Sequence, residues 1–192
     1  MKPFLALSLA LAFGASASAT TPLWMRDVAI SPDGQSIAFT YKGDIYTVPT
    51  GGGAAHRVTS ASSYEASPVW SPDSRRIAYA SDREGSMDVY VIDAVGGTPE
   101  RLTSHSANEI PEAFTPDGKN VLYSAAIQAP VASRMFPSAR LTQLYSVAAD
   151  GNGAPTQMLA TPARFVAFTG DGGSFLYQDV KGMEDEWRKH HT

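Results

Sequence analysis

A charged segment near the end of the sequence carries the residue types most able to do chemistry. "KGMEDEWRKHHT", at residues 181–192, holds three acids, three bases and the adjacent histidines His190 and His191. Adjacent side chains of a strand point to opposite faces, and zinc sites use wider spacings such as H-x₃₋₅-H. We therefore predict a solvated or partner-facing loop and no metal site. A metal ligand or a substrate contact is the less favoured interpretation.

Other patterns that support enzyme chemistry are missing from the sequence. It contains no G-x-S-x-G nucleophile elbow, no H-E-x-x-H motif, no P-loop and no Rossmann fingerprint. No helical pattern follows the glycine run "GGGAAH" at residues 51–56 to bind a phosphate, so this run is predicted to form a hairpin turn. No spacing selects a serine, a histidine and an acid, so we assign no catalytic residue and expect no cofactor.

Four acidic residues recur at one place in a longer repeat. Asp33, Asp73, Asp117 and Asp171 stand in "SPDG", "SPDS", "TPDG" and "TGDG", at steps of 40, 44 and 54 residues. Each stands alone, whereas calcium needs six or more oxygen ligands, so we predict that they cap turns by bonding backbone amides. A tyrosine recurs in the same register, at positions 46, 90 and 145. A period near 44 with four short strands per unit is typical of a β-propeller blade.

The second repeat shows how each unit is built. "PVW", "RRIAYAS", "MDVYVID" and "TPERLT" are predicted to be its four strands, from the alternation of their side chains. Trp70, Phe114 and Phe168 hold one place in successive first strands and are predicted to be core aromatics between blades. The fold class is therefore all-β. We expect a partial, open β-propeller of four-stranded antiparallel blades, three complete, at about residues 23–60, 66–104 and 111–160, and a truncated fourth at 163–192.

These repeats resemble the TolB-like propeller units of TolB, tricorn-type proteases and prolyl-oligopeptidase relatives. The likeness is carried by the turn segments, by "SDREGSMDVYVID" and by "GGTPERLT". "PLWMRDVAISPDG" and "KGMEDEWRKHHT" are similar to segments of bacterial tricorn-like serine peptidases. In those proteins an N-terminal propeller precedes a second propeller, a PDZ-like module and a catalytic domain. The sequence departs from the turn pattern at Ser74 and Gly170, which replace a glycine and a proline.

The first nineteen residues have the pattern of a secretory signal peptide. Lys2 precedes an apolar run at residues 4–13, and an A-S-A cleavage site ends at Ala19. The chain has no cysteine, so neither a lipid anchor nor a disulfide is expected, and the remaining residues fit one domain. A small acidic excess, 19 acids against 15 bases, gives no reason to expect nucleic acid or membrane binding. We predict a secreted, periplasmic protein.

The connections between the second and third strands differ in length between units. They are "KG", "DREGS", an insertion at residues 126–140, and the segment after Gln178. Alternating strand direction places them on one face with the links between blades, and variable loops on a rigid scaffold often bind ligands; drift in tolerant loops is the alternative. An Asp82–Arg83 pair that ties neighbouring blades, or an exposed loop pair, is expected here. The candidate substrate or partner residues of this face are Arg83, His105, Glu109, Arg134, Arg140 and His190.

The resemblance implies the non-catalytic N-terminal propeller of a tricorn-like serine peptidase, which gates or positions a peptide or unfolded polypeptide. The nucleophile and its base would then lie in a C-terminal domain outside these 192 residues. One alternative is an envelope scaffold like TolB that binds protein partners. Another is the propeller of a prolyl-oligopeptidase relative, which needs an α/β-hydrolase domain with G-x-S-x-G. The gene sequence after codon 192 distinguishes these hypotheses.

The purified chain is expected to hydrolyse no peptide, because no nucleophile and base are arranged in its sequence. A panel of fluorogenic peptides measures this directly. Turnover that a single Ser→Ala substitution abolishes would show that the chain has an active site of its own.

The chain alone is also expected to aggregate or self-associate. Three blades and part of a fourth make an open arc, and unpaired strand edges and exposed apolar faces promote association. Residues after about Gln178 are expected to pack poorly. Light scattering measures the outcome, and extending the chain by its next blades should restore a monomer. A monodisperse, cooperatively melting monomer of residues 20–192 would contradict the open arc.

Overall fold

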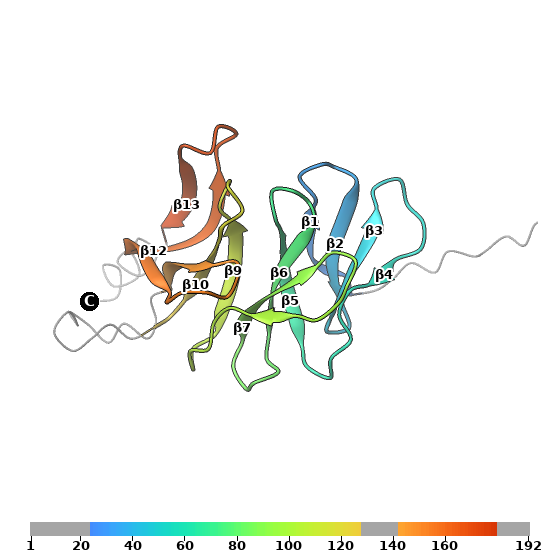
Figure 1. Cartoon of the computed structure of the whole chain (residues 1–192), viewed down its shortest axis with the longest axis horizontal. Helices are drawn as coiled ribbons and strands as arrows, with labels where there is room; N and C mark the ends of the chain where they lie inside the picture. Colours follow the sequence, from blue (N-terminus) through green and yellow to red (C-terminus); the bar gives the residue numbers. More distant parts are fainter. Residues whose placement is uncertain (1–23, 128–141, 180–192) are drawn as a thin grey trace, which may run out of the picture.

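The computed structural model describes residues 24–127 and 142–179 as antiparallel sheets joined by turns and loops (Figure 1). These residues contain no helix, and therefore no helix that is long and apolar enough to cross a membrane. Strands that follow one another along the chain are neighbours in each sheet. The all-β prediction is confirmed.

The sheets contain thirteen strands. The first sheet consists of β1 (Arg26–Ile30), β2 (Ser36–Tyr41), β3 (Asp44–Pro49) and β4 (His56–Arg57). The second consists of β5 (Glu65–Trp70), β6 (Arg76–Ser81), β7 (Asp88–Asp93) and β8 (Glu100–Arg101). The third contains β9 (Glu109–Phe114), β10 (Asn120–Ala125), β11 (Gln143–Ala148) and β12 (Thr156–Phe168), and it continues into β13 (Phe175–Asp179).

Strand β12 is shared by the third and fourth repeats. Its residue Gln157 pairs with β11, and its residue Ala163 pairs with β13. Glu65 of the second sheet follows Arg57 of the first outer strand by eight positions, whereas Ala163 follows Gln157 by six. The shorter link leaves the chain extended. The outer strand of the third repeat and the first strand of the fourth are therefore continuous, although the sequence predicts two separate strands.

The turn between the first and second strands closes in the same way in each repeat. In the first turn, the Ser31 hydroxyl donates to Asp33 Oδ1 at 2.6 Å, and the Gln35 N–H donates to the same oxygen at 3.0 Å. These two bonds hold the pKa of Asp33 below its ordinary value. The acids of the other three turns accept equivalent bonds, with the same direction of pKa shift. The prediction of turn capping is confirmed.

Ser74 fits the place that a glycine holds in the other turns. Its φ is 59°, close to the 70° of Gly34, in the left-handed region that side chains normally avoid. The Ser74 hydroxyl oxygen accepts a hydrogen bond from the Asp33 N–H at 3.1 Å. This contact joins the turns of the first and second sheets, so the departure from glycine adds a link between blades.

The apolar core lies between neighbouring sheets rather than inside one. Ile45 and Ile77 are fully buried between the first and second sheets, and Val89 and Tyr123 are buried between the second and third. Such burial is the main favourable contribution to folding. Trp70 and Phe114 are 9% and 5% exposed, and Phe168 packs against the cluster between the third and fourth repeats. Their prediction as core aromatics is confirmed.

The two seams that join the first three sheets contain the same polar unit. In the second sheet, the Arg101 guanidinium pairs with Asp88 at 2.8 Å and donates through Nε to the Thr103 carbonyl at 2.8 Å. The Thr103 hydroxyl accepts the Val89 N–H at 2.8 Å. A buried glutamate from the first strand of the next sheet, Glu109, lies beside this unit. The matching residues of the preceding seam are Asp44, Arg57, Thr59, Ile45 and Glu65.

The seam between the third and fourth repeats has no charged residue at these positions. Gln143 and Gln157 replace the aspartate and the arginine, and Ala163 replaces the glutamate. The Gln157 amide still donates to the Leu159 carbonyl at 2.8 Å, as the arginine does in the other seams. One hydrogen bond of the unit is therefore retained without its charges.

The described strands form an open arc. The sheets follow one another from β1–β4 to β12–β13, at opposite ends of the molecule in Figure 1. Large apolar side chains are exposed at both ends: Trp24, Val28 and Ile30 at the first, and Phe165 and Leu176 at the last. The expected partial, open propeller is confirmed, and association of the isolated chain stays a prediction.

Removal of the Arg101 charge is expected to destabilise the protein by about 2 kcal/mol. Loss of one partner of a buried ion pair costs roughly 3–5 kcal/mol, and the partial exposure of Arg101, at 37% of its side chain, reduces this through solvent screening. Arg101→Met keeps much of the apolar stem. Urea denaturation of the full-length gene product measures the loss.

Arg57→Met is the matched control in the first sheet. It should destabilise less than Arg101→Met, because Arg57 is more exposed and a second guanidinium, that of Arg83, lies in the same seam. Equal losses for the two variants would show that the number of arginines in a seam does not determine its stability.

Candidate functional site

Three of the six candidate residues on the predicted face lie in the described part of the chain: Arg83, His105 and Glu109. The other three, Arg134, Arg140 and His190, lie outside the described residues, as do the predicted signal peptide and the terminal charged segment. The Met87 carbonyl accepts the Glu109 N–H at 2.7 Å, and the Ser86 hydroxyl donates to the His105 carbonyl at 3.0 Å. The loop before β7 and the link before β9 therefore share one face.

Arg83 pairs with a glutamate, and the expected Asp82–Arg83 pair is wrong. Its guanidinium lies 2.6 Å from Glu65 Oε1, donates to the Tyr79 hydroxyl at 3.0 Å, and stacks 4.3 Å from the centre of the Tyr90 ring. Asp82 instead accepts the Tyr64 N–H at 2.7 Å. Burial raises the pKa of Glu65, and Arg83 opposes that rise. Arg83 is thus engaged inside a seam, where it neutralises a buried carboxylate.

Glu109 and His105 are brought together at the next seam, where no second arginine is present among the described residues. The His105 N–H donates to Glu109 Oε2 at 3.2 Å, while the imidazole Nδ1 accepts the Ala107 N–H at 2.9 Å. Burial raises the pKa of Glu109, and the nearby charge of Asp88 raises it further. These contacts make Glu109 a buried part of the structure and leave little of it accessible to a partner.

A cavity of about 590 Å³ opens at the opposite ends of the first strands. It is lined by residues of all four repeats, including Ala29 of β1, Trp70 of β5, Phe114 of β9 and Phe168 of β12. Strand β5 contacts β1 and β9, and β9 contacts β12, so the cavity lies where the inner strands converge. This volume falls within the range of about 300–1,000 Å³ that is common for ligand sites.

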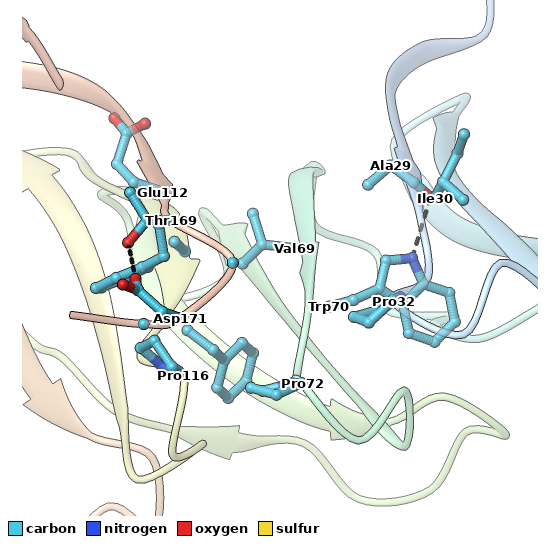
Figure 2. A pocket seen from close by; sticks show the side chains of 15 residues that line it. Ala29, Ile30, Pro32, Val69, Trp70, Pro72, Glu112, Pro116, Thr169 and Asp171 are labelled. Atoms are coloured by element: carbon cyan, nitrogen blue, oxygen red, sulfur yellow. Dashed lines mark hydrogen bonds between the residues drawn. The ribbon is translucent and has the colours of Figure 1, made fainter. Parts of the chain in front are cut away.

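The two sides of this cavity differ chemically (Figure 2). Ile30, Pro32 and Trp70 form one side, and the Trp70 indole N–H is already bonded to the Ala29 carbonyl at 3.0 Å. Glu112 and Asp171 lie on the other side. None of the fifteen lining residues is a lysine, arginine or histidine. The cavity therefore offers an apolar wall opposite an acidic one.

Backbone bulges in the inner strands build the acidic wall. Phe165 of β12 has a φ of 53°, at a break in the pairing of β12 with β13. The bulge directs its N–H to Glu112 Oε2 of β9, at 3.0 Å. Ser67 of β5 has a φ of 55° and donates its N–H to Asp27 Oδ2 at 3.2 Å. A carboxylate of one inner strand thus anchors the bulge of the next strand.

Sequence reasoning placed the functional face at the variable loops and did not find this cavity. Its lining comes from residues about 40 to 54 positions apart along the chain, in the turn repeat itself. The regular turn motif signals structure, because each aspartate caps its own turn. The signal for a site was the acidic residue Glu112, which lies among the apolar residues near the end of β9.

The described residues provide no metal centre. Within residues 24–127 and 142–179, no group of three or more histidine, cysteine, aspartate or glutamate side chains could hold a metal ion. The four turn aspartates use their carboxylates on serine or threonine hydroxyls and backbone amides, which accounts for them without a cation.

The sequence profile of the tricorn protease N-terminal beta propeller domain matches residues 22–192. The chain belongs to this family. The match covers all four repeats. A comparison with curated proteins finds no match.

Solved structures of similar fold include TolB proteins and peptidases. A putative TolB from Agrobacterium tumefaciens superposes with a TM-score of 0.70 at 20% identity, over 84% of this chain and 56% of that one. The tricorn protease gives 0.50 at 18% identity, over 65% and 13%. Porphyromonas gingivalis dipeptidyl peptidase 4 gives 0.55 at 17% identity, over 78% and 22%. The tricorn propeller chain thus spans about half of that TolB and a small part of each peptidase, and these likenesses concern the fold alone.

Glu109→Gln is expected to stabilise the protein increasingly as pH rises from about 4 to 7. The raised pKa of Glu109 means that the folded state retains a proton that the unfolded chain, with a pKa of about 4.3, has released. The contribution of Glu109 to wild-type stability therefore falls as pH rises through this window. Glutamine keeps an acceptor for the His105 N–H and has no charge to bury. Urea denaturation at several pH values measures the difference.

Glu65→Gln is the control for this prediction. It removes a carboxylate that pairs with Arg83 and leaves that guanidinium without its acid, so it should destabilise the protein at pH 7. A Glu109→Gln variant whose stability relative to wild type does not change with pH would refute the buried-proton interpretation.

Proposed function

We propose that this chain is the non-catalytic propeller of a secreted, periplasmic tricorn-like serine peptidase, and that it positions peptide for cleavage elsewhere in the protein. The family match over residues 22–192 carries this proposal. The inner-strand cavity supports it, because a concave site where the inner strands of four repeats converge suits an extended substrate polypeptide that lies along these strands. The predicted signal peptide supports the location.

Gly170→Trp tests the proposed path for polypeptide. Gly170 lines the cavity, its φ is not in the left-handed region, and a Cβ added to it would meet no atom within 4 Å. A tryptophan at this position should therefore narrow the cavity without disturbing the turn. In the full-length gene product, cleavage of unfolded casein is expected to fall at least fivefold, whereas cleavage of a fluorogenic tripeptide is expected to stay unchanged.

Gly51→Trp is the matched control. Gly51 has the same open surroundings and the same absence of a left-handed φ, but it lies in the loop between β3 and β4, outside the cavity. This variant should cleave both substrates like the wild type. Equal casein cleavage by the two variants would contradict passage through the cavity.

A scaffold that binds protein partners is the second candidate function, and the TM-score of 0.70 to a putative TolB favours it. The scaffold hypothesis predicts that the full-length gene product has no peptidase activity. The absence of casein and tripeptide cleavage in the wild-type protein would therefore replace the peptidase proposal with the scaffold.

A further inference from the structure

The inner cavity has a chemical asymmetry that points to a particular class of peptide. Its walls carry two acids and no base among fifteen lining residues, and most of the lining is aliphatic, aromatic or proline. Such a combination complements a segment that has a positive charge next to an apolar side chain. Charge complementarity mainly provides selectivity and orientation, while apolar contact provides affinity.

Both acids are held in place by hydrogen bonds from neighbouring groups. The Asp171 carboxylate accepts the Thr169 hydroxyl at 2.6 Å and the Gly173 N–H at 3.0 Å, both through Oδ1. These bonds lower the pKa of Asp171. Glu112 accepts the Phe165 N–H through Oε2. Each carboxylate thus uses one oxygen to fix its position and has a second oxygen for which no bond within the described residues is assigned.

The apolar wall is equally preorganised. Trp70 packs in the seam between the first and second sheets, with its indole N–H satisfied by the Ala29 carbonyl. Pro72 and Pro116 come from neighbouring turns; in Figure 2 Pro116 lies beside Asp171, and Pro72 lies between it and Trp70. Rigid rings lose little conformational entropy when they bind a ligand.

We infer that this cavity selects peptide segments in which a lysine or arginine adjoins large apolar side chains, with Glu112 and Asp171 facing the cation and the Trp70 wall facing the apolar group. This inference rests on the proposed function, because it names the substrate class of the same site. The inferred preference for a basic residue next to apolar ones would belong to the propeller, and it would not depend on the specificity of a peptidase domain elsewhere in the protein.

The test measures binding of three fluorescein-labelled decapeptides to the full-length gene product by fluorescence anisotropy. All three share an alanine-glycine host, with Lys-Leu-Phe, Glu-Leu-Phe or Lys-Ser-Ser at the centre. The Lys-Leu-Phe peptide is expected to bind at least tenfold more tightly than either comparator. Gly170→Trp should abolish this binding, and Gly51→Trp should not change it.

Two substitutions remove the acidic charges without removing the bonds that position them. Asp171→Asn and Glu112→Gln each retain an oxygen that can accept the existing hydrogen bonds, so each should reduce the preference for Lys-Leu-Phe over Glu-Leu-Phe at least threefold. Asp117→Asn is the matched control, because Asp117 caps the same kind of turn without lining the cavity. It should leave the preference unchanged.

The possible outcomes separate this inference from the proposed function. Binding of all three peptides with equal affinity, or a preference that Asp171→Asn and Glu112→Gln do not reduce, overturns the selectivity and leaves peptide binding intact. A preference for Glu-Leu-Phe also overturns it. Failure of every peptide to bind contradicts both the inference and the peptide-positioning function on which it rests.

Discussion

The arc depends on the packing of each sheet's faces against its neighbours, because a four-stranded sheet of this size cannot bury its apolar side chains alone. Ile45, Ile77 and Tyr123 are fully buried only through contact between sheets. The same packing traps polar groups at the seams. Asp88 and Glu109 are buried away from water, so the free energy cost of burying their carboxyl groups depends on the partners that the seam provides.

The three seams differ in the number of charged residues that they bury. The first places two arginines, Arg57 and Arg83, beside two acids, and within the described part of the chain the second places one arginine beside Asp88 and Glu109. The third uses glutamines and an alanine. Burying an ion without a partner costs free energy. A buried acid is therefore either protonated or paired with a group of opposite charge. The second seam is therefore the place where protonation and folding are coupled, while the third is insensitive to pH at these positions.

The cavity follows from the same architecture. Inner strands from four repeats converge, and their bulges turn backbone amides toward carboxylates of the neighbouring strand, as Phe165 does toward Glu112. A site built in this way has rigid walls, because its lining residues belong to strands and capped turns. In the function that we propose, this rigid site positions polypeptide and bond cleavage takes place elsewhere in the protein.

The sequence by itself determined the blade. The spacing of the four turn aspartates, the alternation within strands and the aromatics Trp70, Phe114 and Phe168 in three of the first strands predict the fold class and core, because these patterns act within one repeat and recur. The tertiary structure alone decided which residues of separate strands, loops and repeats meet. It paired Arg83 with Glu65 rather than Asp82, joined two predicted strands into β12, and placed the cavity opposite the predicted loop face. Such contacts depend on how the sheets are stacked, and a pattern read along the chain does not specify which residues about 40 positions apart will meet.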